Sequence, residues 1–193
     1  MMKKSKRNNI IFLVIIAVVL IPQTRQPIQV LLHKGIALIN PVSIEKESDR
    51  IVISNYDWKL KTEEGVSYNF NQSKGKVVII NFWATWCPPC IAEMPSLQKL
   101  YDKYGDKVEF LFVTNDSIDK IKAFKAKKNY TFPVYQILSN PIKELQTSSI
   151  PRTLIISQKG EIIIDKSGAV DWFGENIQNE MNKLLSAAES LKK

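Results

Sequence analysis

The chain has 193 residues, of which 45% are hydrophobic and 24% charged, with 7 Gly, 9 Pro and 2 Cys. This length accommodates one ordinary domain with an appended segment, and the composition excludes disordered, collagen-like and disulfide-stapled small proteins. The formal net charge is +8, but residues 50–193 carry only +4, which gives little support to a nucleic-acid-binding surface.

Residues 1–22 have the layout of a secretory signal peptide or a signal anchor. Four basic residues lie in the first nine positions: Lys3, Lys4, Lys6 and Arg7. An unbroken apolar run then covers residues 10–21. As a helix, this twelve-residue run would extend about 18 Å, less than the ~30 Å hydrocarbon core of a bilayer. A cleavable signal fits that length, but no A-x-A-like site follows. We therefore expect an uncleaved anchor, with its basic end in the cytoplasm and the rest of the chain outside.

Residues 23–50 are predicted to form an amphipathic membrane-proximal segment and a tether. Apolar residues recur at helical spacing over residues 28–39, as in a helix that lies on a membrane surface (Ile28, Leu31, Leu32, Ile36, Ile39). A linker helix that packs on the protein core through this face would show the same pattern, so that alternative stays open. Residues 40–50, rich in Ser, Glu and Asp, are expected to form the tether.

Residues 51–193 are predicted to form one α/β domain. The expected elements are a hairpin of strands 58–60 and 66–70, a central strand 77–84, a helix 88–104, a strand 108–114 and a helix 117–129. A second hairpin of strands 153–157 and 161–165 and a closing helix over about 172–191 follow. This order predicts a three-layer sandwich, a mixed central sheet flanked by helices, with an N-terminal β-hairpin. The lysines of helix 117–129 are assigned to a solvated face and not to nucleic-acid binding.

Both cysteines lie in one Cys87-Pro-Pro-Cys90 motif, where the central strand gives way to a helix. Cys87 is predicted to be an exposed residue at the helix N-cap, where free N–H groups and the positive end of the helix dipole favour a thiolate. Cys90 lies one turn further on the same face, close enough to form a disulfide. Because only a thiolate attacks a disulfide, we expect Cys87 to be the nucleophile and Cys90 the resolving thiol.

Three other kinds of site would use the same two cysteines. A zinc or copper site needs further ligands, and the only histidine, His33, lies in the membrane-proximal segment. An inert structural disulfide would close a very short loop and would therefore add little stability. We accordingly expect no metal and a redox-active Cys87–Cys90 pair.

The segment Asn81-Phe-Trp-Ala-Thr-Trp-Cys-Pro-Pro-Cys90 resembles the active-site segment of the thioredoxin superfamily. Its continuation, Cys90-Ile-Ala-Glu93-Met-Pro95, resembles the membrane-tethered TlpA/ResA-type thiol–disulfide oxidoreductases, and the likeness extends over residues 58–185. It implies a thioredoxin-like fold, disulfide-bearing protein substrates and a transmembrane thiol electron donor. It also implies a single N-terminal anchor in a bacterial inner membrane, a periplasmic catalytic domain and a role in cytochrome c maturation. The sequence contains no cofactor motif, so we expect no bound cofactor.

The resemblance also assigns residues that bind the substrate. Ile150-Pro151 matches the cis-proline loop that faces the disulfide in this superfamily, and X-Pro is the bond type that takes the cis form at low cost. The backbone of Ile150, with Trp86 and Pro151, is expected to bind an extended substrate strand. A trans proline ahead of a strand is the alternative.

A proton acceptor is the remaining part of the predicted site. The buried aspartate of thioredoxins, six residues before the first cysteine, is replaced by Asn81, which cannot accept a proton. The resemblance assigns that role to Glu93, the one acid expected nearby and on the same helix face as Cys90. An exposed helix glutamate is the alternative.

The two prolines between the cysteines bear on the direction of the reaction. Pro88 and Pro89 have no N–H, so two donors that could stabilise the Cys87 thiolate are missing. A less stabilised thiolate makes the couple more reducing. The sequence therefore predicts a periplasm-facing disulfide reductase, with a disulfide-forming oxidant and a redox-inactive peptide-binding module as alternatives.

Overall fold

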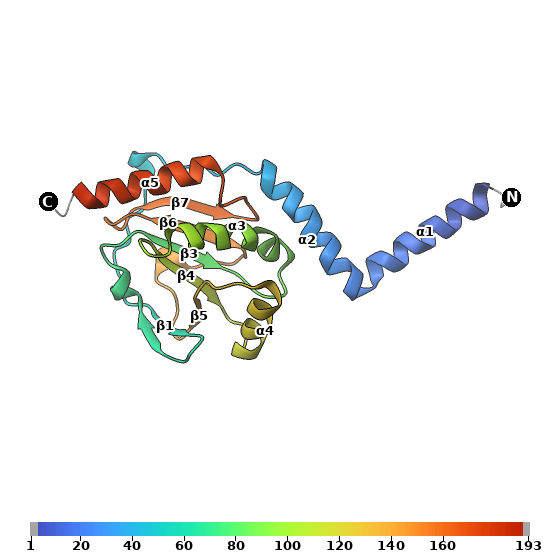
Figure 1. Cartoon of the computed structure of the whole chain (residues 1–193), viewed down its shortest axis with the longest axis horizontal. Helices are drawn as coiled ribbons and strands as arrows, with labels where there is room; N and C mark the ends of the chain where they lie inside the picture. The colour runs from blue at the N-terminus through green and yellow to red at the C-terminus, as the bar shows by residue number, and fades with distance from the viewer. Residues whose placement is uncertain (1–3, 191–193) are drawn as a thin grey trace.

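The computed structural model describes the chain from residue 4 to residue 190. Two helices, α1 (Lys4–Leu20) and α2 (Pro22–Ile39), project from a sheet-based domain, with α1 the more distant (Figure 1). Lys3 and Leu191, which the sequence assigns to the basic flank and the closing helix, lie outside the described residues. Between residues 4 and 190, none of the helices combines the length and the apolar character needed to cross a bilayer.

A mixed sheet forms the centre of the domain. Its described strands run in the order β2-β1-β5-β4-β3-β6-β7, with β3–β4 and β4–β5 parallel and the other neighbours antiparallel. The strands are β1 (Lys59–Thr62), β2 (Ser67–Asn69), β3 (Val78–Phe82), β4 (Glu109–Thr114), β5 (Val134–Ile137), β6 (Arg152–Ile156) and β7 (Ile162–Ser167). All five residues of β3 are buried, as expected for a strand covered on both faces. The predicted hairpins and the predicted α/β thioredoxin-like fold are confirmed.

The helices gather on one face of the sheet. Helices α3 (Pro88–Tyr104), α4 (Ile118–Lys128) and α5 (Glu175–Ser190) all contribute buried residues to the core that contains Ile79 and Trp83. The opposite core contains Ile80 and Phe82, because successive side chains of a strand point to opposite faces. Within the described chain, that second core receives residues from loops and short 3₁₀ turns but from no α-helix. The layer that covers this second face of the sheet therefore consists of loops and short 3₁₀ turns.

Two elements differ from the sequence-based expectation. Strand β5 was not expected, because four residues that follow Pro133 carry no clear alternation and only two of them are buried. The closing helix begins at Glu175 and not near residue 172, since Asp171 forms a side-chain turn with the N–H of Phe173 (Oδ1 to N, 3.1 Å). Trp172 is consequently a fully buried loop residue and not the first residue of the helix.

The segment expected to be a tether is attached to the sheet edge. The N–H of Glu45 donates to the carbonyl of Ile163, and the N–H of Ile162 donates to the carbonyl of Ile51, both at 2.8 Å. Ile53 follows as a buried core residue. The stretch expected to be a tether, residues 40–50, is therefore joined to β7 through the backbone of Glu45.

Candidate active site

The disulfide lies where β3 ends and α3 begins. Cys87 is the N-cap of α3, and its Sγ accepts a hydrogen bond from the N–H of Cys90 at 3.3 Å. The two cysteines are joined as a disulfide with their Cα atoms 5.3 Å apart. Pro88 and Pro89 occupy the first two helical positions, so the Cys90 N–H is the first backbone donor of the helix. The predicted N-cap position and the predicted pairing are confirmed.

The cis-proline loop faces this disulfide. The Ile150–Pro151 peptide bond is cis, as the resemblance implied and unlike the trans alternative. The carbonyl oxygen of Ile150 lies 3.9 Å from the Sγ of Cys87. Pro151 is buried, and its carbonyl accepts a hydrogen bond from the N–H of Gly168 at 2.9 Å, which ties the loop to the end of β7.

Cys87 is less accessible than expected. Its exposed fraction is 3%, against 0% for Cys90, so the prediction of an exposed Cys87 is wrong for this disulfide form. The physical reason is the approach of the cis-proline loop through Ile150. The adjacent Trp86, by contrast, is 64% exposed and forms the most prominent apolar surface beside the disulfide.

Glu93 is buried within the helix-covered core. It is 1% exposed, three residues beyond Cys90 on α3, so the alternative of an exposed helix glutamate is wrong. Its Oε1 accepts a hydrogen bond from Asn81 (Nδ2, 2.8 Å), and its Oε2 accepts one from the indole of Trp172 (Nε1, 3.0 Å). Residues from β3, α3 and the loop before α5 therefore meet at one carboxyl group.

The environment of Glu93 favours its neutral form. Burial raises the pKa of this carboxyl group to about 8, although the hydrogen bonds from Trp172 and Asn81 act in the opposite direction. Asn81 is the cross-strand partner of Thr153, and its Nδ2 also donates to the hydroxyl of Thr153 at 2.8 Å. Its Oδ1 has no hydrogen-bond partner among the described residues. Asn81 thus positions Glu93 without competing for its proton.

A second acid near the disulfide was missed by the sequence analysis. Asp116, which follows β4, is 9% exposed, and its Oδ2 accepts a hydrogen bond from the backbone N–H of Thr85 at 2.6 Å. This bond ties the loop ahead of Cys87 to the end of the neighbouring strand. The parallel pairing of β3 and β4 brings their carboxyl ends together, a signal that could have identified Asp116.

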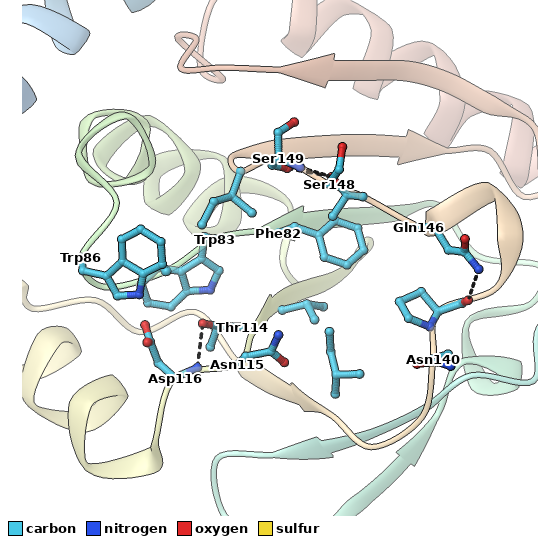
Figure 2. A pocket seen from close by; sticks show the side chains of 16 residues that line it. Phe82, Trp83, Trp86, Thr114, Asn115, Asp116, Asn140, Gln146, Ser148 and Ser149 are labelled. Carbon is cyan, nitrogen blue, oxygen red and sulfur yellow. Dashed lines mark hydrogen bonds between the residues drawn. The ribbon is translucent and has the colours of Figure 1, made fainter.

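A cleft of about 810 Å³ opens beside the disulfide on the face without α-helices. Figure 2 shows Trp86 and Asp116 on one side of it and Gln146, Ser148 and Ser149 on the other. Its floor is apolar and its far wall, from Asn140 to Ile150, is formed by a polar loop. The predicted substrate-binding residues Trp86 and Ile150 both line this cleft, whereas Pro151 is not among its lining residues.

Within the described part of the chain, no three His, Cys, Asp or Glu side chains are placed to hold a metal ion together. Neither cysteine is a free thiol in this form.

Known proteins resemble this chain in both sequence and structure. The model of the AhpC/TSA family matches residues 55–172. The thioredoxin-like protein YneN of Bacillus subtilis is 37% identical over 110 residues, covering 55% of this chain and 65% of YneN, slightly less than two thirds of its length. The thiol-disulfide oxidoreductase ResA of Oceanobacillus iheyensis is 32% identical over 170 residues, 83% of this chain and 82% of ResA. The crystal structure of StoA from Bacillus subtilis, 30% identical, superposes with a TM-score of 0.50 over 59% of this chain and 89% of StoA.

Proposed function

This chain belongs to the AhpC/TSA family and is a TlpA/ResA-like thiol–disulfide oxidoreductase, and we propose that it reduces protein disulfides on the outer side of a bacterial inner membrane. The observation that supports the proposal most strongly is the Cys87–Cys90 disulfide, which faces the carbonyl of Ile150 at the edge of an open cleft.

In the proposed reaction, the Cys87 thiolate attacks one sulfur of a substrate disulfide and releases the other sulfur as a thiolate. The thiolate of Cys90 then attacks the Sγ of Cys87, which breaks the mixed disulfide and forms the intramolecular one. Two electrons pass from the dithiol to the substrate. Glu93 takes the proton of Cys90 when its carboxyl group is ionised, and its pKa of about 8 gives it a proton affinity close to that of an ordinary thiol, whose pKa is ~8.5.

The helix N-terminus supports the reducing direction. A helix usually offers its first backbone N–H groups to a group at the N-cap, but Pro88 and Pro89 supply none. The Cys90 N–H is left as the donor to the Cys87 sulfur, at 3.3 Å. A thiolate with one donor is less stabilised than a thiolate with several, and the reduced form then gives up its electrons more readily.

The cleft favours an extended peptide as the substrate. Trp86 offers an exposed apolar surface next to the disulfide, and the loop with Ile150 offers backbone groups for strand-like hydrogen bonds. The resemblance to the TlpA/ResA-type proteins supports substrates of this kind in cytochrome c maturation. We propose that Trp86, Ile150 and Pro151 bind them.

We also propose that residues 1–22 anchor the chain in the membrane and that a transmembrane thiol carrier returns electrons to Cys87 and Cys90. The basic start and the exposed apolar side chains of α1 support the anchor. No described residue forms a second redox pair, since both cysteines of the sequence lie in one disulfide.

The test is the reduction of insulin by the dithiol form under single-turnover conditions. The proposal predicts stoichiometric reduction of insulin and recovery of the Cys87–Cys90 disulfide. A dithiol form that leaves insulin oxidised would point to the redox-inactive module. A disulfide form that rapidly oxidises reduced peptides while the dithiol form is inert would point to the oxidant.

A further inference from the structure

Helix α2 is apolar on two opposite sides. One side packs on the domain through small residues: Ala37 forms a buried cluster with Ala92 of α3 and Ala169, and Val30 packs against that cluster. The opposite side presents six large apolar side chains with exposed fractions between 41% and 81%: Ile28, Leu31, Leu32, Ile36, Leu38 and Ile39. At 3.6 residues per turn, these six are distributed around the face opposite to Val30 and Ala37. We call them the α2 apolar face.

The α2 apolar face is not the one that joins the helix to its domain. In the alternative of a linker helix, the α2 apolar face would pack on the core of the domain. The structure instead places the small side chain of Ala37, with Val30 beside it, against the domain. One backbone hydrogen bond supports that attachment, because the N–H of Asp171 donates to the carbonyl of Ala37 at 3.2 Å. A soluble domain rarely leaves an apolar patch of this extent in contact with water, so something covers it.

Charge indicates what covers it. The sequence contains no Asp or Glu before Glu45, whereas six Lys and Arg residues precede that position. Arg25 and Lys34 are exposed on α2 itself: Lys34 lies beside the apolar face, and Arg25 lies about one turn before its first residue. Basic side chains beside exposed apolar ones are typical of a helix at the interface of an anionic membrane. A second copy of the chain would bring the same uncompensated positive charges together, which disfavours a symmetric dimer through this face.

We propose that the α2 apolar face lies on the surface of an anionic lipid bilayer and fixes the orientation of the catalytic domain to the membrane. The proposal rests on the membrane anchor proposed for residues 1–22. Since α1 ends at Leu20 and α2 begins at Pro22, an anchor in α1 brings α2 to the surface of the same bilayer.

The position of α2 has a consequence for the redox site. Packed helices have axes about 8–10 Å apart, so α3 lies one helix layer from the lipid surface. Ala92, the contact residue on α3, follows Cys87 by five positions, which is about 7.5 Å along a helix. The disulfide is thereby held close to the membrane, where a membrane-embedded electron donor or a membrane-attached substrate can reach it.

The test uses full-length, disulfide-bonded protein in vesicles of phosphatidylethanolamine and phosphatidylglycerol. Because Cys87 and Cys90 are paired, one introduced cysteine supplies the only reactive thiol for a nitroxide label. Labels are compared at Leu31→Cys, on the apolar face, and at Lys127→Cys, exposed on α4. The measurement is spin relaxation by oxygen, which partitions into lipid, and by a nickel chelate, which stays in water.

We expect the Leu31 label to respond several-fold more to oxygen than to the nickel chelate, and the Lys127 label to show the reverse. Equal access of the chelate to both labels would overturn the proposal, as would failure of the chain to float with the vesicles. Spin–spin broadening at Leu31 with low access to both relaxants would assign the face to a second copy instead. Insulin reduction by unlabelled protein in the same vesicles reports separately on the proposed reductase function.

Discussion

The indole N–H of Trp172 donates a hydrogen bond to Oε2 of Glu93 (Nε1 to Oε2, 3.0 Å) and joins the loop before α5 to the helix that carries both cysteines. Trp172 is held in place by a second bond, from its backbone N–H to the hydroxyl of Ser96 at 3.0 Å. Glu93 is thus a fixed, buried carboxyl group whose pKa of about 8 reflects desolvation more than its hydrogen bonds. Its geometry suits a group that accepts and returns one proton during each turnover.

Replacing Glu93 by Gln keeps the shape of the side chain and removes the proton acceptor. We expect the resolution step by Cys90 to slow by about 10²-fold or more, the usual range for loss of a general base, with a much smaller effect on the first attack by Cys87. Stopped-flow reaction with a model disulfide separates the two steps. Glu175→Gln, on the exposed first turn of α5, is the matched control. Resolution at the unmutated rate would show that Glu93 carries no proton in the reaction.

The same residue makes stability depend on pH. The raised pKa of Glu93 means that the folded protein holds this proton more tightly than the unfolded chain does. Its contribution to the free energy of unfolding is therefore full below the ordinary pKa of 4.5 and is lost as the pH rises to about 8. Urea unfolding of the disulfide form across this range should show a decline that Glu93→Gln reduces. Parallel pH profiles for the two proteins would contradict the assignment.

The environment of Glu93 shows where sequence reasoning succeeded and where it stopped. The motif placed Cys87 at a helix start and Glu93 on the same helix face as Cys90, because capping and helix periodicity are local properties. The burial of Glu93 was implied only by the family resemblance. Trp172 as a partner of Glu93 could not be predicted, since its side chain reaches the site only through the long-range packing of the chain after β7. The predicted closing helix even included Trp172, whose loop position depends on the turn at Asp171.

Contacts between strands that are far apart in the sequence could not be predicted from the sequence either. Strand β5 is too short to show a period, and it exists because β1 and β4 both pair with it. Asp116 reaches the loop before Cys87 only once β4 lies next to β3. The backbone bonds that join Glu45 and Ile51 to β7 likewise depend on an edge strand far away in the sequence. The secondary-structure propensities of individual residues do not predict any of these long-range contacts.

Replacing Cys87 and replacing Cys90 should have different effects on the mixed disulfide with the substrate. Cys87→Ser should abolish disulfide reduction, because the side chain at the N-cap is the proposed nucleophile. Cys90→Ser should still attack substrates and accumulate mixed disulfides, which non-reducing electrophoresis and mass spectrometry detect. Accumulation of mixed disulfides in Cys87→Ser, with none in Cys90→Ser, would reverse the two roles.

The prolines between the cysteines should set the stability of the Cys87 thiolate. Replacing Pro88 and Pro89 by Ala residues adds two backbone N–H groups at the start of α3, directed toward the N-cap. We expect a lower pKa for Cys87 and a more oxidising couple, measured by the ultraviolet absorbance of the thiolate during a pH titration. Pro95→Ala, later in the same helix, serves as the control for helix stability. An unchanged or higher pKa in the double variant would show that these donors do not determine the thiolate's stability.

The reduction potential of the Cys87–Cys90 couple, measured by equilibration of the full-length protein with glutathione or dithiothreitol buffers, tests the proposed reductase function most directly. We expect a value near the roughly −270 mV of thioredoxin and well below the roughly −180 mV of protein disulfide isomerase. A potential near the roughly −120 mV of the strong oxidant DsbA would contradict the proposed direction of electron transfer.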